Sequence, residues 1–418
     1  MSKNSEYSAN SVVSFFEQPN VETDLIPVAM GIPLGIERVY NPSVGIGGAY
    51  GAWGQSYDNE TLFNFLENQV GVPFPPENRM KLSTLGFVHR HHTPRISPAE
   101  DLALEVEVGA RFLREAMVAN GWQPEEIAGV LIGMTGPVSD DYTELIAKES
   151  GIPEDALKIS VHKACDSSMG ALQLILNPDP AFHTQMERNI AKELHGKKVL
   201  VGGIEGLSRF VKKSRDNSAL QLFGNGAGVI GVIPGKTMMY LVGKQHELYD
   251  AKGVLSLSMH YPHSGNMQEG QSIIEVSQAG DNHYRFAGLM NEPLDGAPVD
   301  MAGPMGMVKL FVRTGVQVVR DVVSKYQALM DEKGFTNEIK VGIVHHANLK
   351  INSLKAKRLK ANGINIQMPW MLSEFGNVSA ASNMIAFLRQ LPMIEPGDHI
   401  LFDGFGAGTY YDTFAVAI

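Results

Sequence analysis

The sequence contains very little cysteine: Cys165 is the single one among 418 residues. One cysteine excludes an intramolecular disulfide and suits the reducing cytoplasm, where we expect this protein. No run of about 18 apolar residues occurs, so we expect no membrane-spanning helix. The polar residues 1–6 lack the apolar stretch of a secretory signal peptide. A glycine-rich phosphate loop followed by Lys-Ser or Lys-Thr is also missing, and we expect no cofactor.

The composition is that of an ordinary protein with a large core. Apolar residues make up 44% of the chain and charged residues 19%. The formal net charge of −10 argues against general nucleic-acid binding. A length of 418 residues exceeds one small core and suits two fused halves.

Helix and strand patterns alternate along the chain, which favours an α/β fold with sheets covered on both faces by helices. Buried strands are predicted at residues 130–134, 157–161, 199–201, 228–233, 400–402 and 413–418, with another ending at residue 344. Helices are predicted at residues 100–119, 169–176 and 309–330.

Cys165 follows the predicted strand 157–161 and precedes the predicted helix 169–176. A thiol at the first turn of a helix faces unpaired N–H groups and the positive end of the helix dipole, which lowers its pKa. Cys165 is therefore a candidate nucleophile, and the alternative is a small buried hydrophobic residue.

Two later segments supply polar partners for such a nucleophile. An apolar strand runs into His345 and His346, and Asn377 lies in a turn before a helix start of small residues. Each of these residues alone is more often structural, as a satisfied histidine or a turn residue. Together with Cys165 they form a Cys–His–Asn set.

Five further motifs occur in a fixed order. They are Phe223-Gly224-Asn225-Gly226-Ala227-Gly228, Met301-Ala302-Gly303, His345-His346-Ala347-Asn348-Leu349-Lys350, Gly376-Asn377-Val378-Ser379-Ala380-Ala381-Ser382 and Gly404-Phe405-Gly406-Ala407-Gly408. With Cys165, they resemble the motifs of β-ketoacyl-acyl carrier protein synthase III, a family of thiolase-fold condensing enzymes. The chain departs from the family at His346, where glutamine is usual, and at Asn225, where aspartate is usual.

The resemblance implies a thiolase fold, with five layers (α/β/α/β/α) built from two pseudo-symmetric halves. We place the nucleophile half at residues 1–235 and the half with the histidine and asparagine at residues 236–418. The family also implies a homodimer.

The resemblance further implies the roles of the site residues. Cys165 would attack an acyl thioester, and the backbone N–H groups of Cys165 and Ala407 would form the oxyanion hole. His345 and Asn377 would donate hydrogen bonds that stabilise the enolate of a decarboxylating malonyl or β-ketoacyl thioester. The expected activity is that of an acyltransferase performing Claisen condensation in specialised fatty acid or polyketide biosynthesis.

Other functions remain as alternatives. One is a ketosynthase-cyclase that joins two β-ketoacyl units, as in alkylresorcinol formation, and another is an acyltransferase that forms no carbon–carbon bond. A degenerate partner subunit is the non-enzymatic alternative, against which the intact Cys–His–Asn set argues. A thiolase itself needs a second catalytic cysteine, which this chain lacks.

Basic residues follow His345 on a predicted helix, namely Lys350, Lys355, Lys357, Arg358 and Lys360. By resemblance, Lys350, Lys357 and Arg358 fall where the family contacts acyl carrier protein or the phosphopantetheine phosphate. The substrates implied are acyl carrier protein and acyl-CoA thioesters. A solvated helix face is the alternative.

Several other ionisable residues attract notice. The run His89-Arg90-His91-His92 has no supporting cysteine or acidic ligand, so we expect no metal there. Glu205 and Glu374 lie near predicted site segments but are not assigned a catalytic role.

Overall fold

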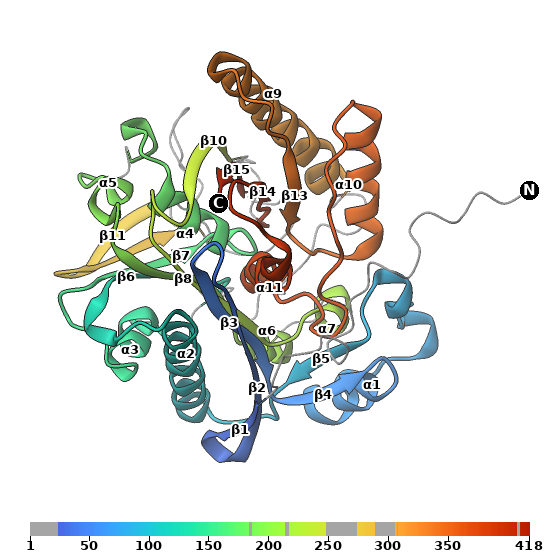
Figure 1. Cartoon of the computed structure of the whole chain (residues 1–418). Coiled ribbons are helices and arrows are strands. Elements are labelled where there is room, and N and C mark those ends of the chain that lie inside the picture. The colour runs from blue at the N-terminus through green and yellow to red at the C-terminus, as the bar shows by residue number, and fades with distance from the viewer. Residues whose placement is uncertain are drawn as a thin grey trace, which may run out of the picture.

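The computed structural model describes residues 24–136, 138–183, 186–213, 217–247, 274–288, 306, 308–407 and 410–418. Within these ranges the chain forms two main sheets with helices on their outer faces and between them (Figure 1).

The larger sheet has nine strands in the order β1-β2-β3-β9-β8-β6-β7-β12-β11. Their bounds, in chain order, are β1 (Asp24–Val28), β2 (Ile32–Asn41), β3 (Ile46–Trp53), β6 (Ile127–Gly133), β7 (Leu157–His162), β8 (Lys198–Glu205), β9 (Gly226–Val232), β11 (Glu275–Gly280) and β12 (His283–Ala287). Strands β6, β7 and β8 pair in parallel, so their carboxyl ends meet at one edge. Strands β6 to β9 are buried along almost their entire length, as expected for a sheet covered on both faces.

The smaller sheet has four strands in the order β10-β15-β14-β13. They are β10 (Met239–Glu247), β13 (Ile339–Val344), β14 (His399–Asp403) and β15 (Tyr410–Ala417). The chain passes from the larger to the smaller sheet between β9 and β10, which supports our proposal of a boundary near residue 235. The hairpin β11–β12 lies beyond that boundary in sequence but joins the larger sheet beside β7.

Helices α4 (Ser167–Leu176) and α11 (Ser382–Gln390) contact both sheets and form the central layer. All ten residues of α4 are buried, which explains its apolar sequence without a polar face. On the outer faces, α2 (Pro98–Asn120) and α3 (Tyr142–Glu149) cover the larger sheet, and α9 (Gly315–Lys333) covers the smaller one. The described residues thus form five layers, as the thiolase fold requires.

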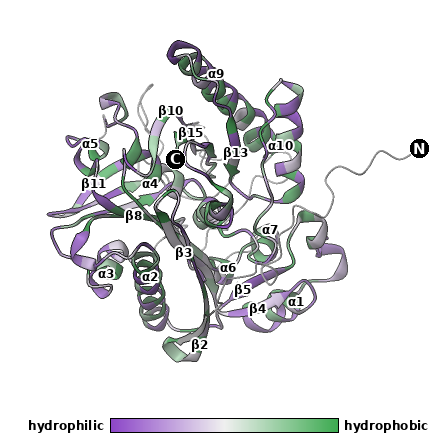
Figure 2. Cartoon of the chain, in the orientation of Figure 1, coloured by the Kyte–Doolittle hydropathy of each residue, from purple (hydrophilic) through white to green (hydrophobic). Residues whose placement is uncertain are grey.

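The outer helices are amphipathic, and in Figure 2 both α2 and α9 carry green and purple residues along their length. Helix α2 begins at Ser97, whose hydroxyl accepts a hydrogen bond from the Glu100 N–H, while the Glu100 carboxylate accepts one from the Ser97 N–H. Gly121 ends the helix in the left-handed conformation, with φ of 65°.

The remaining elements are shorter or lie beside the two sheets. They are β4 (Gln55–Asp58) and β5 (His89–His92), which form a two-stranded sheet; helices α1 (Thr61–Phe65), α5 (Ile190–Leu194), α6 (Leu207–Lys213), α7 (Asn217–Leu222) and α10 (Leu349–Ala361); the π-helical turns η3 (Leu66–Val70) and η8 (Val308–Thr314); and the 3-10 turns η2 (Ala29–Gly31), η4 (Pro76–Asn78), η5 (Leu82–Leu85), η6 (Pro124–Glu126), η7 (Pro180–His183), η9 (Ser379–Ala381) and η10 (Leu391–Met393). No described helix has the length and apolar character needed to cross a bilayer.

The predicted helices and strands are confirmed within a few residues at each end. The predicted helix 309–330 starts as the π-helical turn η8 before it continues as α9. Two parts of the predicted motifs, residues 301–303 and Gly408, lie outside the described residues.

The central layer gives a stability prediction. Leu172 in α4 is fully buried between the sheets, so Leu172→Ala should lower the free energy of unfolding by about 2–5 kcal/mol. Val118 on α2 is 57% exposed, and Val118→Ala should change the free energy of unfolding by no more than about 0.5 kcal/mol. Urea unfolding followed by circular dichroism measures both; equal effects would contradict the layer assignment.

Candidate active site

The candidate nucleophile lies in a tight turn between β7 and α4. Cys165 is partly exposed, whereas its neighbours Ala164 and Asp166 are buried. Ala164 has φ of 50°, a left-handed conformation that a non-glycine residue adopts only where the surrounding structure enforces it. The turn therefore presents the thiol to a cavity while its flanks remain in the core.

The glycine-rich loop after β14 packs directly against this turn. A Cβ atom on Gly404 would lie 1.8 Å from Asp166 Oδ1, and one on Gly406 would lie 2.1 Å from the Lys163 carbonyl oxygen. Both distances are far below van der Waals contact, so only glycine allows this approach. The loop thereby brings Ala407 to the wall of the Cys165 cavity.

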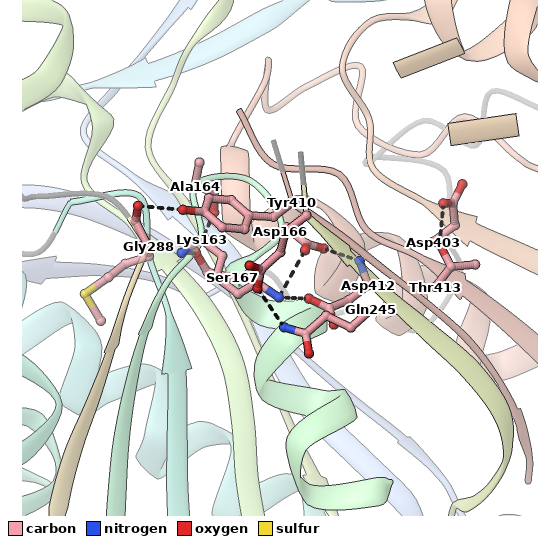
Figure 3. A network of polar contacts seen from close by, with 12 residues as sticks. Lys163, Ala164, Asp166, Ser167, Gln245, Gly288, Asp403, Tyr410, Asp412 and Thr413 are labelled. Carbon is pink, nitrogen blue, oxygen red and sulfur yellow. Dashed lines mark hydrogen bonds and ion pairs between the residues drawn. The ribbon is translucent and has the colours of Figure 1, made fainter. Parts of the chain in front are cut away.

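A buried charge cluster holds the turn in place (Figure 3). Lys163 forms an ion pair with Asp412 on β15, and its Nζ lies 3.6 Å from Asp166 Oδ2. Burial opposes the charge on Lys163, yet the carboxylates of Asp412 and Asp166 raise its pKa overall. Burial and the neighbouring Asp412 raise the pKa of Asp166 well above its usual range. The cluster links the nucleophile turn of the larger sheet to the smaller sheet.

The expectation of a lowered thiol pKa was wrong. Burial raises the pKa of Cys165 to about 12, and the carboxyl groups of Glu205 and Asp166 add to the effect. A hydrogen bond from the Ser379 hydroxyl to Cys165 Sγ, at 3.0 Å, acts in the opposite direction but is weaker. Burial and the acidic neighbours thus outweigh the hydrogen bonds that favour the thiolate.

His345 follows the last residue of β13 and lines the same cavity as Cys165. Burial lowers its pKa to about 3, and charge interactions with His346 and Lys355 act in the same direction, so the imidazole is neutral. Its Nδ1 lies 2.7 Å from Ser382 Oγ, which is also 2.7 Å from the Ser379 carbonyl oxygen.

The Ser382 hydroxyl sets the tautomer of His345. It carries one hydrogen, which it donates to the Ser379 carbonyl oxygen. His345 Nδ1 then carries the imidazole proton and donates to Ser382 Oγ, whereas a turn of the hydroxyl toward Nδ1 would place that proton on Nε2. Sequence reasoning missed Ser382 as a site residue, although it closes the motif that contains Asn377.

Hydrogen bonds of the backbone N–H and of the side-chain oxygen fix the position of Asn377. Its N–H donates to the Leu222 carbonyl at 2.7 Å, and its Oδ1 accepts from the Ser379 N–H at 2.9 Å. Gly376, with φ of 75°, supplies the turn that this arrangement needs. Because Oδ1 is engaged by the backbone, the orientation of the amide is fixed and Nδ2 remains as the donor end.

One cavity brings these predicted residues together. Its lining combines polar groups with apolar side chains and consists of Thr135, Ala164, Cys165, Leu207, Phe210, Phe223, His345, Asn377, Ser379, Phe405 and Ala407. Three residues far apart in sequence thus share one site with the predicted oxyanion-hole position Ala407. A nucleophile, an imidazole and an amide around an apolar space can hold and activate an acyl chain.

Two other residues that the sequence singled out, His346 and Glu374, have structural contacts. The His346 ring contacts the Val344 carbonyl through Nδ1 and accepts from the Met371 N–H through Nε2. Glu374 forms an ion pair with Arg389 at 3.0 Å.

Asn225 accepts two hydrogen bonds from Ser208 and donates one to the Trp53 carbonyl. These hydrogen bonds give Asn225 a structural role. In the histidine run, His92 contacts the Ser208 hydroxyl and stacks on Phe65. No group of three or more potential metal ligands occurs among the residues that the structure describes.

One of the basic residues predicted on the helix after His345 is buried. Lys350, Lys357, Arg358 and Lys360 are exposed on α10, as expected. Lys355, in contrast, is fully buried, and its Nζ lies 2.5 Å from Asp403 Oδ2. It points toward the smaller sheet and pairs with a core carboxylate, so it does not belong to the exposed basic face.

Comparison with known proteins agrees with this geometry. Residues 330–418 match the family model described as 3-oxoacyl-[acyl-carrier-protein] synthase III, C terminal. A β-ketoacyl-[acyl-carrier-protein] synthase III of Fusobacterium nucleatum is 25% identical over 78% of this chain and 86% of its own. One from Lactiplantibacillus plantarum is 26% identical over 61% of this chain and 66% of its own.

The solved structure of the Aquifex aeolicus 3-oxoacyl-[acyl-carrier-protein] synthase III superposes with a TM-score of 0.59 and 19% identity, covering 93% of this chain and 100% of that one. The chain is thus similar to synthase III in the sequence of residues 330–418 and in its fold over almost its whole length. In several curated relatives, however, the matched region spans little more than half of their length. A tetronic acid condensing enzyme and OleA of Xanthomonas campestris share the fold, with TM-scores of 0.57 and 0.56 at 15% and 12% identity; the alignments cover 92% and 93% of this chain and 98% of each.

The low pKa of His345 gives a direct prediction. Its imidazole resonances should not titrate between about pH 5 and about pH 9, whereas an ordinary histidine titrates near 6.5. Nuclear magnetic resonance of histidine-labelled protein, with His345→Gln for assignment, measures this. A midpoint near 6.5 for His345 would contradict a buried, neutral imidazole.

Proposed function

We propose that this protein is a β-ketoacyl synthase III-like condensing enzyme that acylates Cys165 and then performs a decarboxylative Claisen condensation. The observation that carries the proposal is the convergence of Cys165, His345 and Asn377 on one cavity with apolar walls. Its substrates are an acyl thioester and a malonyl or β-ketoacyl thioester. Fatty acid or polyketide biosynthesis in the cytoplasm is the proposed setting.

The first half-reaction transfers the acyl group. Cys165 Sγ attacks the thioester carbonyl, and the carbonyl oxygen becomes an oxyanion. The backbone N–H groups of Cys165 and Ala407, both on the cavity wall, are the proposed donors to that oxyanion. The apolar side chains of Phe210, Phe223 and Phe405 would cover the acyl chain.

The second half-reaction forms the carbon–carbon bond. Loss of carbon dioxide from the malonyl thioester generates an enolate, whose oxygen needs hydrogen-bond donors. Asn377 Nδ2 is one proposed donor. His345 Nε2 is the other, which requires the Ser382 hydroxyl to turn from the Ser379 carbonyl to His345 Nδ1 so that the imidazole proton lies on Nε2. Both donors are neutral, so they stabilise the developing charge without binding a proton.

Donor variants test this second step. Asn377→Ala and His345→Ala should each lower carbon dioxide release from a malonyl-carrier protein by about 10²–10³-fold, because each removes one donor to the enolate. Acylation of Cys165 should change much less. Radiolabelled carbon dioxide release and intact-protein mass spectrometry measure the two steps separately. Wild-type carbon dioxide release from either variant would contradict the assignment.

The exposed residues Lys350, Lys357 and Arg358 are the proposed contact for the acidic acyl carrier protein or the phosphopantetheine phosphate. Helix α10 starts four residues after His345 and so lies at the site. The side-chain amide of Asn352 on this helix donates to the His345 carbonyl at 2.9 Å.

Charge reversal tests the carrier contact. The pair Lys357→Glu and Arg358→Glu should lower kcat/KM for a carrier-protein substrate on the order of tenfold, because it replaces attraction by repulsion. Lys333→Glu, at the exposed end of α9, is the control and should have little effect. Equal loss in both would indicate a general charge effect and would reject the α10 contact.

A cyclising ketosynthase that joins two β-ketoacyl units and an acyltransferase without carbon–carbon bond formation are the competing proposals. Product analysis separates them: a linear β-ketoacyl product supports the main proposal, and a ring supports the first alternative. Acyl transfer to another acceptor without carbon dioxide supports the second. The homodimer implied by the family also belongs to this proposal, and light scattering of the purified protein measures it.

A further inference from the structure

Condensation requires the Cys165 thiol to lose its proton, yet burial holds the thiol pKa well above neutral. The imidazole that lines the same cavity is a poor acceptor for this proton. His345 is held neutral with a pKa of about 3, so it is a weak base. The group in hydrogen-bond contact with Cys165 Sγ is instead the Ser379 hydroxyl, at 3.0 Å.

From Ser379 the polar contacts continue in one direction. Ser379 Oγ lies 2.5 Å from Thr135 Oγ1, and the Thr135 hydroxyl donates to Glu205 Oε1 at 2.7 Å. The hydroxyl of Thr135 has one hydrogen, which Glu205 accepts, so Ser379 donates to Thr135. With its own hydrogen directed to Thr135, Ser379 accepts the hydrogen of the neutral Cys165 thiol across the 3.0 Å contact, and it donates to Sγ once the thiol is ionised. An unbroken line of hydrogen bonds therefore runs from sulfur to carboxylate.

We propose that Glu205 accepts the Cys165 proton through Ser379 and Thr135 and is thereby a positioning residue for the nucleophile. This proposal rests on the proposed function, because it describes how its first half-reaction starts. As the Cys165 S–C bond forms and the C–S bond of the thioester breaks, the thiol proton moves to Ser379, that of Ser379 to Thr135, and that of Thr135 to Glu205. The leaving thiolate takes its proton from water.

The second half-reaction restores the starting state. When the carbon–carbon bond forms, Cys165 leaves as a thiolate and recovers its proton from Glu205 along the same line. Glu205 returns to its carboxylate form, so no external acid or base is consumed by the protein.

The surroundings of Glu205 suit such a group. Its side chain is buried at the end of β8, and its Oε1 accepts from the N–H groups of Thr135 at 2.8 Å and Ala380 at 3.1 Å. Burial raises its pKa to about 7, while the hydrogen bonds partly oppose the shift. A carboxyl group with a pKa near the working pH both accepts and returns a proton.

Charged and titratable groups around Glu205 have other partners. The charge of Glu205 contributes to the raised pKa of Arg209, but Arg209 pairs with Glu105, at 3.4 Å. Tyr142 donates its hydroxyl hydrogen to the Glu105 carbonyl. Neither interrupts the line from Cys165 to Glu205.

A proton relay and a purely electrostatic role of Glu205 predict opposite changes in the reactivity of the Cys165 thiol when Glu205 is neutralised. The negative charge of Glu205 raises the Cys165 pKa, so removing it should make the thiol more reactive if charge alone matters. Removing a proton acceptor should make the thiol less reactive. Glu205→Gln distinguishes these outcomes, and Ser379→Ala breaks the line while it leaves the Glu205 carboxyl in place.

The test is acetylation of Cys165 by p-nitrophenyl acetate, followed by intact-protein mass spectrometry from about pH 5 to about pH 9. The wild-type rate should rise with pH through an inflection near 7. Glu205→Gln and Ser379→Ala should lose this inflection, and the rate at about pH 8 should fall by about tenfold or more. Glu105→Gln, which alters another buried carboxylate, should keep it. Melting temperatures verify that each variant is folded.

An equal or faster rate in Glu205→Gln would overturn the relay, as would absence of the inflection or of any acetylation in the wild type. The readout uses no malonyl substrate. If condensation fails in all assays but the inflection depends on Glu205 and Ser379, the relay stands and the proposed function falls. If condensation is found and Cys165 of Glu205→Gln is acetylated like that of the wild type, the proposed function stands and the relay falls.

Discussion

The buried charge cluster of Lys163, Asp166 and Asp412 is the interaction on which the site depends (Figure 3). It joins the turn after β7 in the larger sheet to β15 in the smaller one. Breaking such a buried pair by removing one partner costs about 3–5 kcal/mol, because an unpaired charge remains in the core. The close approach of Gly404 and Gly406 adds a steric requirement to the electrostatic one. The nucleophile is therefore positioned only when both halves of the chain are folded together.

The burial of Cys165 and His345 between the two halves determines the protonation states of their side chains. It keeps the Cys165 thiol protonated and the His345 imidazole neutral, so no resting ion pair activates the sulfur. Catalysis must then come from groups that act during the reaction: donors aimed at developing oxyanions, and an acceptor for the thiol proton. Glu205 is the one group in contact with this line whose pKa, about 7, matches an acceptor at neutral pH. The sulfur and the imidazole are thus both neutral at rest, and the sulfur becomes charged only while bonds are changing.

Sequence reasoning was most successful where local patterns decide the structure. Apolar runs and helix periodicity predicted the strands and helices, and motif resemblance predicted the residues that meet at the cavity. It failed where the outcome depends on contacts between distant segments. The thiol pKa is governed by burial and by Glu205, 40 positions later in the chain, and neither is visible in the turn around Cys165. Likewise, Lys355 reads as part of a basic helix face, but its partner Asp403 lies on another element. Ser379 and Ser382 lay within a recognised motif, and their roles emerged only from their distances to Cys165 and His345.

The most direct test of the central claim is intact-protein mass spectrometry of the wild type and Cys165→Ala with acyl thioesters of different length, followed by malonyl-carrier protein. The account predicts a covalent acyl adduct in the wild type only, which disappears on malonyl addition as a β-ketoacyl product forms. An adduct that persists with malonyl and moves to another acceptor would contradict condensation. No adduct with any donor would leave the thiolase fold in place and would contradict Cys165 as an acyl-carrying nucleophile.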